Sequence, residues 1–319
     1  MPSQGNKIVA MTASSELIHD RDRQSFWLWK KAVEQRTGVR ITADRERALV
    51  NLLQQRMREL QYRDINQYFA DSLDDARGAE EWSRLVDNLL IQETSFFRHQ
   101  PSLDYVARWA SSHMENHNPA SPLWLWSLGC SSGEEAYSLA ITLCEALGEP
   151  NGRPRFAIVA TDISHRAIAE ARLGVYQARR LSQVCPSLKD KYFDSVGPNR
   201  YRVKPFLRAH ICFLTSNVLD YRPPLMRRKL NLIYCQNMLI YFRRWQRREI
   251  INQLTQQMKD DGHLIIGMGE LGTWTPANLS RSVPRTVQAY SKKNIDIATA
   301  VSAATQADTR KSQQAIRRY

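Results

Sequence analysis

A segment near the middle of the chain, Leu123 to Leu143, most constrains the fold. It reads LWLWSLGCSSGEEAYSLAITL, in which an apolar run predicts a strand, small residues predict a turn, and an amphipathic stretch predicts a helix. Gly129 and Gly133 free the backbone of the turn and allow it to approach a ligand closely. The segment therefore predicts an α/β sheet with a ligand site where the strand ends. An ordinary strand-to-helix turn with acids in the first helical turn is the alternative interpretation.

Two carboxylates, Glu134 and Glu135, follow this turn. A turn that holds phosphate needs a lysine or free backbone amides at the helix N-terminus, so the acidic pair indicates a ligand with cationic or hydroxyl groups. S-adenosylmethionine has both, in its amino group and its ribose, and it has no phosphate. The turn therefore predicts an S-adenosylmethionine site, which other residues have to support.

Composition excludes several classes of protein. The chain has 319 residues, 43% of them hydrophobic, which is enough for a buried core and about two domains. No apolar stretch reaches the roughly 20 residues of a membrane span, and the N-terminus lacks the apolar core of a signal peptide, so we expect a cytoplasmic protein. Five cysteines without a CxxC pair indicate reduced thiols and no structural metal. The net charge of +13 favours an anionic partner: nucleic acid, a membrane surface or an acidic protein.

Periodicity divides the chain into four zones. Residues 1–20 and 297–319 are polar and aperiodic, so we expect both ends to be disordered. Residues 21–92 have helical periodicity throughout and predict a basic N-terminal helical domain. Its arginines form either a solvated face or a docking surface for acidic helices or nucleic acid. These arginines are Arg36, Arg40, Arg45, Arg47, Arg56, Arg58 and Arg63.

The fourth zone, residues 93–296, alternates apolar strands with helices, which is typical of a parallel sheet covered on both faces. A turn at Gly197-Pro198-Asn199 with alternating flanks predicts a hairpin within an inserted antiparallel β subdomain at about 188–209. The fold class is therefore α/β, a Rossmann-like sheet with a helical N-terminal domain and a small inserted β subdomain. The expected strands are 123–128, 156–161, 210–214, 230–234, 263–268 and 286–292.

Polar residues follow several of these strands. Asp162 ends the second strand, where a carboxylate commonly accepts hydrogen bonds from ribose hydroxyls, although it could instead cap the helix beginning near Ser164. Asn217 follows the third strand, where it either faces an adenine ring or belongs to an ordinary turn. Asn237 and Tyr241 follow the fourth strand and are expected at the crevice where doubly wound sheets bind ligands.

The segment IQETSFFRH, residues 91–99, joins the helical domain to the sheet. Its position predicts one wall of a cleft between the two. Phe96 and Phe97 are typical of a core, whereas Arg98 beside them is a candidate functional cation.

Five separated segments resemble those of one family in order and spacing: ETSFFR, GCSSGEEAYSLAI, ATDIS, SNVL and NMLIYF. Over roughly residues 25–292 the chain is similar to the CheR-type chemotaxis receptor glutamate methyltransferases. The resemblance implies a class I S-adenosylmethionine-dependent methyltransferase sheet. It also implies methyl transfer to glutamate side chains of transmembrane chemoreceptors, with glutamyl methyl esters and S-adenosylhomocysteine as products. The implied partner is the cytoplasmic helical region of those receptors, with no nucleic acid and no membrane insertion.

The resemblance also assigns site residues. Arg98 and Tyr241 fall where the family places the groups thought to orient the acceptor carboxylate, and no metal is implied. The positions that fall where the family contacts the cofactor are Gln92, Thr94, Arg98, Glu134, Asp162, Asn217, Val218, Asn237 and Met238.

The chain departs from the family pattern at several positions. Gln92 stands where Asn is general, Cys130-Ser131-Ser132 replaces Ala-Ser-Thr, and Gln236 replaces an Arg. Met268-Gly269-Glu270 stands where His-Ser-Glu is common, so this chain lacks that His and Ser. The hairpin near Gly197 is short, which weakens the expectation that it binds a receptor's C-terminal tail peptide, as in some family members.

Two other functions remain open. Positive charge also suits an RNA or DNA methyltransferase, but amino-methylating enzymes carry an Asn/Asp-Pro-Pro-Tyr/Phe motif where this chain has Gln236 to Leu239. Cys235 beside this segment is expected to be a buried strand residue and not a nucleophile. A non-catalytic module that senses S-adenosylmethionine is the other possibility, and the presence of both Arg98 and Tyr241 argues against it.

Overall fold

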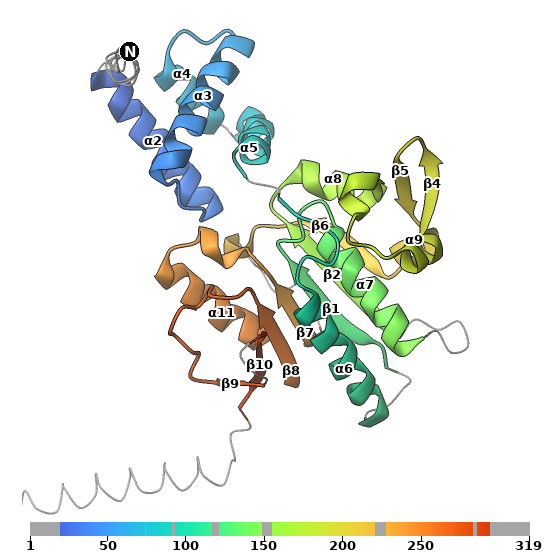
Figure 1. Cartoon of the computed structure of the whole chain (residues 1–319). Coiled ribbons are helices and arrows are strands. Elements are labelled where there is room, and N and C mark those ends of the chain that lie inside the picture. The colour runs from blue at the N-terminus through green and yellow to red at the C-terminus, as the bar shows by residue number, and fades with distance from the viewer. Residues whose placement is uncertain are drawn as a thin grey trace, which may run out of the picture.

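The structure is a computed structural model that describes residues 20–73, 75–90, 93–116, 121–148, 155–220, 228–282 and 286–293. Four of the described helices belong to an N-terminal part, and an α/β part follows it (Figure 1). The ends that the sequence predicts to be disordered lie outside the described residues, except for Asp20, where the first described helix begins. None of the described helices is long and apolar enough to cross a membrane.

The helical domain has its own aromatic core. Trp29 is completely buried, and its ring centroid lies 4.8 Å from that of Tyr68 and 5.7 Å from that of Trp82. Aliphatic residues at helical spacing, Leu49 and Leu53 among them, complete this core. The helices are α2 (Asp20–Thr37), α3 (Ala43–Glu59), α4 (Ile65–Leu73) and α5 (Asp75–Leu89).

Arg56 belongs to the interior of this domain. Its guanidinium is bound by Glu81, with a shortest N–O distance of 2.6 Å, and also by Glu59, and only 7% of the residue is exposed. Tyr68 donates a hydrogen bond to Glu81 at 2.6 Å. The prediction that Arg56 lies on an exposed basic face is therefore wrong, because α5 brings the partly buried carboxylate of Glu81 against this side of α3.

A seven-stranded sheet in the order β6-β2-β1-β7-β8-β10-β9 forms the centre of the α/β part. The first five strands are parallel, whereas β10 is antiparallel to both of its neighbours. The sequence predicted a parallel sheet, which is wrong at this edge. Only residues 282–287 separate β9 from β10, too few for the crossover that a parallel pair requires. The strands are β1 (Leu123–Leu128), β2 (Phe156–Asp162), β6 (Ile211–Thr215), β7 (Leu230–Cys235), β8 (Met258–Ile266), β9 (Leu279–Arg281) and β10 (Gln288–Lys292).

Helices cover both faces of this sheet. Leu125 of β1 packs in the same cluster as residues of α6 and α7, whereas the next residue, Trp126, packs with residues of α11. Such burial on both faces explains why these strands read as continuous apolar runs. The covering helices are α6 (Gln100–Asn116), α7 (Glu134–Leu147), α8 (His165–Leu173) and α11 (Arg244–Gln257).

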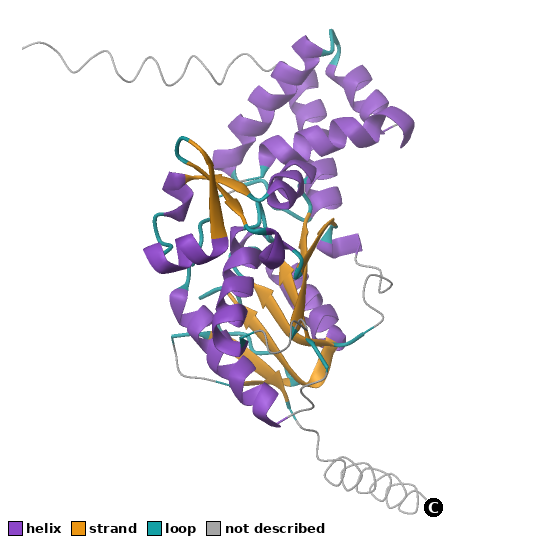
Figure 2. Ribbon diagram, turned by 90° about the vertical axis from the view of Figure 1, so that its right-hand side faces the viewer, coloured by secondary structure: helices purple, strands orange, loops and turns teal. Residues whose placement is uncertain are grey.

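A small antiparallel sheet of three strands, in the order β3-β5-β4, lies beside the main sheet (Figure 2). The predicted hairpin is present as β4 (Phe193–Gly197) and β5 (Arg200–Val203). The third strand, β3 (Val175–Gln177), lies before the expected range of 188–209. Short helical segments accompany the sheet: η2 (Ala178–Leu181), α9 (Pro186–Tyr192) and α10 (Pro205–Arg208).

The turn between α2 and α3 fixes the helical domain against the sheet domain. The backbone N–H of Arg40 donates to the carbonyl of Tyr241 at 2.9 Å, and the Asn217 side chain donates to the carbonyl of Arg36 at 2.6 Å. Gly38 allows this close approach, because its φ is 72° and a Cβ atom there would lie 2.6 Å from Leu219 and Phe242. The α2–α3 turn therefore lies directly on η3 (Val218–Asp220) and η5 (Leu239–Tyr241).

Candidate active site

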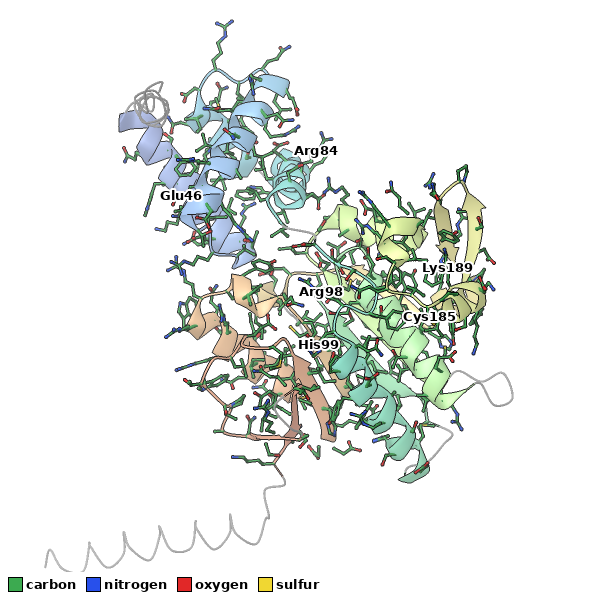
Figure 3. All side chains as sticks on the ribbon, in the orientation of Figure 1. Glu46, Arg84, Arg98, His99, Cys185 and Lys189 are labelled. Atoms are coloured by element: carbon green, nitrogen blue, oxygen red, sulfur yellow. The ribbon has the colours of Figure 1, made fainter. Side chains whose placement is uncertain are left out.

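A pocket opens at the carboxyl ends of β1, β2, β6 and β7, where the helical domain meets the sheet. This is the edge at which doubly wound sheets bind ligands. Three further segments line it: the α2–α3 turn, the first residues of α3, and the stretch 93–103 that leads into α6. Arg98 and His99 of that stretch lie near the centre of the molecule, in the α/β part (Figure 3).

The glycine turn after β1 has an unusual backbone. Gly129, Ser131 and Gly133 have positive φ values of 76°, 50° and 96°. A Cβ at Gly129 would lie 3.0 Å from the Met238 side chain, so a larger residue would push the turn against the β7 loop. Asn237 in that loop also has a positive φ, of 56°. A left-handed backbone costs free energy at a residue other than glycine, and such residues concentrate at ligand sites. Ser131 and Asn237 are two of them, and both line the pocket.

Asp162 holds the glycine turn in place. Its carboxylate accepts hydrogen bonds from the backbone N–H groups of Ser131, at 2.8 Å, and Ser164, at 2.9 Å. Burial raises the pKa of the Asp162 carboxyl, and these backbone hydrogen bonds oppose that effect. The cap of α8 is Ser164, whose hydroxyl accepts from Ala167 N–H at 3.0 Å. Asp162 therefore remains available to the pocket.

The two adjacent glutamates have different surroundings. Glu135 lines the pocket and accepts a hydrogen bond from the Ser127 hydroxyl at 2.7 Å. Burial raises the pKa of the Glu135 carboxyl to about 8, and the nearby carboxylates of Glu270 and Asp162 act in the same direction, whereas Arg98 opposes them. Glu134 is not among the residues that line the pocket. It is completely buried and binds Arg180 and the Ser132 hydroxyl.

Arg98 and Tyr241 face the same pocket from different elements. The guanidinium of Arg98 donates to the carbonyl of Glu93 at 2.8 Å, and it forms no ion pair with another described residue. Tyr241 ends η5, where the centroid of its ring lies 4.8 Å from the guanidinium carbon of Arg45. The pocket therefore contains cationic and hydroxyl groups that can bind a carboxylate.

The side chain of Glu270 holds the loop that carries Asn237 and Tyr241 in place. This carboxylate is 1% exposed and accepts from the backbone N–H groups of Gly267, at 2.7 Å, and Ile240, at 3.1 Å. Arg247 donates to the carbonyls of Ile240 and Glu270 at 3.0 and 2.9 Å. In the segment Met268-Gly269-Glu270, where His-Ser-Glu is common in the family, only Glu270 agrees with the family pattern. These hydrogen bonds indicate that Glu270 positions the loop.

Two family models match this chain. The one described as "CheR methyltransferase, SAM binding domain" matches residues 92–283, and the one described as "CheR methyltransferase, all-alpha domain" matches residues 24–90. The chain belongs to the CheR methyltransferase family. It is an S-adenosylmethionine-dependent methyltransferase, as the sequence predicted.

Relatives of known name agree with this membership. Chemotaxis protein methyltransferase 2 of Pseudomonas aeruginosa is 31% identical over 268 residues, which are 83% of this chain and 92% of the relative. The chemotaxis protein methyltransferase of Escherichia coli is 32% identical over 247 residues, 75% of this chain and 81% of the relative. The chemotaxis protein methyltransferase of Borreliella burgdorferi is 28% identical over 245 residues, which are 75% of this chain and 85% of the relative.

Two buried polar atoms show that the pocket suits the cofactor of this CheR methyltransferase. The Ser131 hydroxyl and the Nδ1 atom of His99 are enclosed by protein, and both lack a hydrogen-bond partner among the described residues. Both residues line the pocket. Buried polar groups are almost always satisfied, so these atoms fit a polar ligand there. With Asp162 for hydroxyl groups and Glu135 for a cation, the residues present fit S-adenosylmethionine.

The structure brings together most of the residues that the sequence assigned to the site. Glu134 lies outside the pocket lining, and Gln92 lies outside the described residues. The assigned residues that line the pocket are Thr94, Arg98, Asp162, Asn217, Val218, Asn237, Met238 and Tyr241.

Sequence reasoning missed two charged residues of the pocket. Glu135 was noted as one of an acidic pair, but no sequence signal separates it from Glu134, because the orientation of α7 decides which carboxylate faces the pocket. Arg45 was counted only as one of many arginines in the helical domain. Its contact with Tyr241 joins segments that are far apart in the sequence.

The contact between Glu134 and Arg180 gives a first prediction. Replacing Arg180 with Met leaves a completely buried carboxylate without its cation, so we expect the free energy of unfolding to fall by about 1–3 kcal/mol; the Arg180 side chain is 34% exposed, and solvent screens part of the interaction. Chemical denaturation measures this change. Arg179→Met, which removes an exposed neighbouring charge, is the matched control.

Arg180→Met and a further variant, Glu134→Gln, together test whether Glu134 contacts the cofactor. We expect Glu134→Gln to change the Kd for S-adenosylhomocysteine by less than about threefold, because its carboxylate binds Arg180 and Ser132. A large loss of affinity in Glu134→Gln, with none in Arg180→Met, would show that Glu134 binds the cofactor directly, as the family resemblance implied.

Proposed function

We propose that this CheR methyltransferase transfers the methyl group of S-adenosylmethionine to glutamate side chains in the cytoplasmic helical region of transmembrane chemoreceptors, and that it acts in the cytoplasm. The products are glutamyl methyl esters and S-adenosylhomocysteine. One observation carries the proposal: Arg98 and Tyr241, which can orient a carboxylate, line the same pocket as the cofactor candidates Asp162 and Asn237. The names of the curated relatives support a role in chemotaxis.

Arg98 and Tyr241 suit an acceptor that needs orientation more than activation. A glutamate side chain has a pKa near 4.3, so it is already ionised at neutral pH and needs no general base. S-adenosylmethionine supplies a methyl group on a sulfonium; the carboxylate oxygen forms the new O–CH3 bond, and the electron pair of the broken C–S bond goes to sulfur. No proton has to move, so alignment of the carboxylate is the main task of the protein.

Arg98 suits this task because its planar guanidinium binds a carboxylate in a defined plane. Very tight binding of the acceptor carboxylate by Arg98 would also stabilise the ground state of the reaction and make the carboxylate oxygen less nucleophilic. Arg98 therefore acts mainly through geometry. Its position is restrained by the hydrogen bond to the Glu93 carbonyl.

Exposed arginines of the helical domain suit an acidic partner. Arg40, Arg47, Arg58 and Arg63 are all exposed. Chemoreceptor methylation regions are expected to be long helices rich in glutamate, so these side chains steer their approach electrostatically. Association should weaken as salt concentration rises.

The proposal is tested by incubating the purified protein with radiolabelled S-adenosylmethionine and membranes from its own organism. We expect label on a receptor-sized protein, and we expect mild base to release it as methanol, because carboxyl methyl esters are labile to base. Label that is stable to base, or label in nucleic acid, would contradict the proposal and favour a different acceptor.

A further inference from the structure

The site of this enzyme contains a cation that comes from the helical domain. Arg45 lies in the first turn of α3 and lines the pocket together with Arg98 and Tyr241. The rest of the α3 basic set faces other surroundings: Arg47 and Arg58 are exposed, and Arg56 is paired inside the domain.

The placement of Arg45 is unfavourable for the helix itself. The N-terminus of a helix carries partial positive charge, which favours acidic residues in the first turn and disfavours cations. The two neighbours of Arg45, Asp44 and Glu46, follow this rule. Arg45 gains no compensating ion pair from a described residue, and the nearby carboxylate of Glu46 binds Lys30 instead. A cation that opposes the helix dipole and lines a pocket fits a negatively charged ligand.

The position of Arg45 is defined from both domains. Its guanidinium carbon lies 4.8 Å from the centroid of the Tyr241 ring. Its backbone N–H donates to the carbonyl of Thr42 at 2.9 Å, and the backbone N–H of Arg40, in the preceding α2–α3 turn, donates to the carbonyl of Tyr241 at 2.9 Å. Stacking on an aromatic ring leaves the edge N–H groups of a guanidinium free to donate. Arg45 is therefore held beside Tyr241 with hydrogen-bonding capacity to spare.

We propose that Arg45 is a second guanidinium for the acceptor carboxylate, in addition to Arg98, so that the acceptor site is complete only when the helical domain is docked. This inference rests on the proposed function and identifies a further acceptor-binding residue. Two guanidinium groups carried by different domains restrict the carboxylate more than one group does, which favours one orientation of its oxygen. The helical domain then contributes directly to the reaction as well as steering the partner.

Arg45→Ala tests the inference, and Arg108→Ala is the matched control because it removes the same charge from an exposed position outside the pocket. Each variant is assayed with receptor-containing membranes at about 0.15 M salt, where surface charges are screened beyond about 8 Å. We expect kcat/KM for the receptor to fall about tenfold in Arg45→Ala, the effect of losing one charged hydrogen bond, and to change less than about threefold in Arg108→Ala. Arg45→Lys should recover part of the loss.

Binding of S-adenosylhomocysteine and thermal unfolding separate a role of Arg45 in acceptor binding from a role in cofactor binding or in stability. Calorimetry should give a Kd for Arg45→Ala within about twofold of wild type, and thermal unfolding should be little changed. Equal activity of the Arg45 and Arg108 variants would overturn the inference, and so would a loss of product affinity in Arg45→Ala that matches its loss of turnover. A wild-type protein that forms no methyl ester defeats the proposed function first, and that result is distinct from these two.

Discussion

Replacing Arg98 with Ala is expected to lower the rate of methyl transfer by about 100-fold, the effect of losing alignment by roughly 1 Å in a site that works by orientation. The pocket geometry provides the reason. Arg98 is held through the Glu93 carbonyl and forms no ion pair with another described residue, so its guanidinium is free to bind the acceptor. Single-turnover transfer from radiolabelled S-adenosylmethionine to receptor membranes measures the change.

Three comparisons make the Arg98 result specific. Arg98→Lys retains the charge but loses the planar fork, so we expect it to recover only a small part of the activity. Arg108→Ala, on an exposed face of α6 outside the pocket, should behave like wild type. S-adenosylhomocysteine should still bind Arg98→Ala measurably. Unchanged turnover in this variant would exclude a role for Arg98 in orienting the acceptor.

The affinity for S-adenosylhomocysteine is expected to rise by up to about fiftyfold between pH 6 and pH 8. Burial raises the pKa of Glu135 to about 8, so its carboxyl is mostly neutral at pH 6. The ionised form attracts the ligand's amino group, which belongs to a free amino acid and stays protonated throughout this range, so the titration of Glu135 sets the rise. This expectation depends on Glu135 facing that amino group.

Glu135→Gln removes the titrating group without changing its size. We expect this variant to lose the rise in affinity between pH 6 and 8 and to bind about as well as wild type at pH 6. Glu145→Gln, an exposed carboxylate on the same helix, should retain the pH profile of wild type. Calorimetry at a series of pH values measures both. An identical profile for Glu135→Gln and wild type would place the amino group of the ligand elsewhere.

The raised pKa of Glu135 also predicts the direction of a stability change. Because the pKa is near 8 in the folded protein and near 4.5 in the unfolded chain, the folded state holds a proton that the unfolded state releases between these values. Stability should therefore decrease as pH rises through this window. Denaturant unfolding of Glu135→Gln at pH 6 and pH 8 should show a smaller decrease than wild type.

Local sequence determined most of the elements and much of the site. The run from Leu123 through the glycine turn predicted β1, the turn and α7, because burial on both faces demands a continuous apolar strand and a glycine marks the left-handed backbone. Asp162, Asn237 and Tyr241 were predicted because parallel strands bring their carboxyl ends to the same edge.

The tertiary structure decided which charged groups face the ligand. Glu134 and Glu135 are indistinguishable in sequence, but the pitch of α7 directs one toward Arg180 and the other into the pocket. Arg45 and Arg56 both read as surface arginines; α5 brings Glu81 against Arg56, and docking of the helical domain places Arg45 over Tyr241. Periodicity reports which face of a helix is buried, but the contacts between distant segments decide what each buried charge meets.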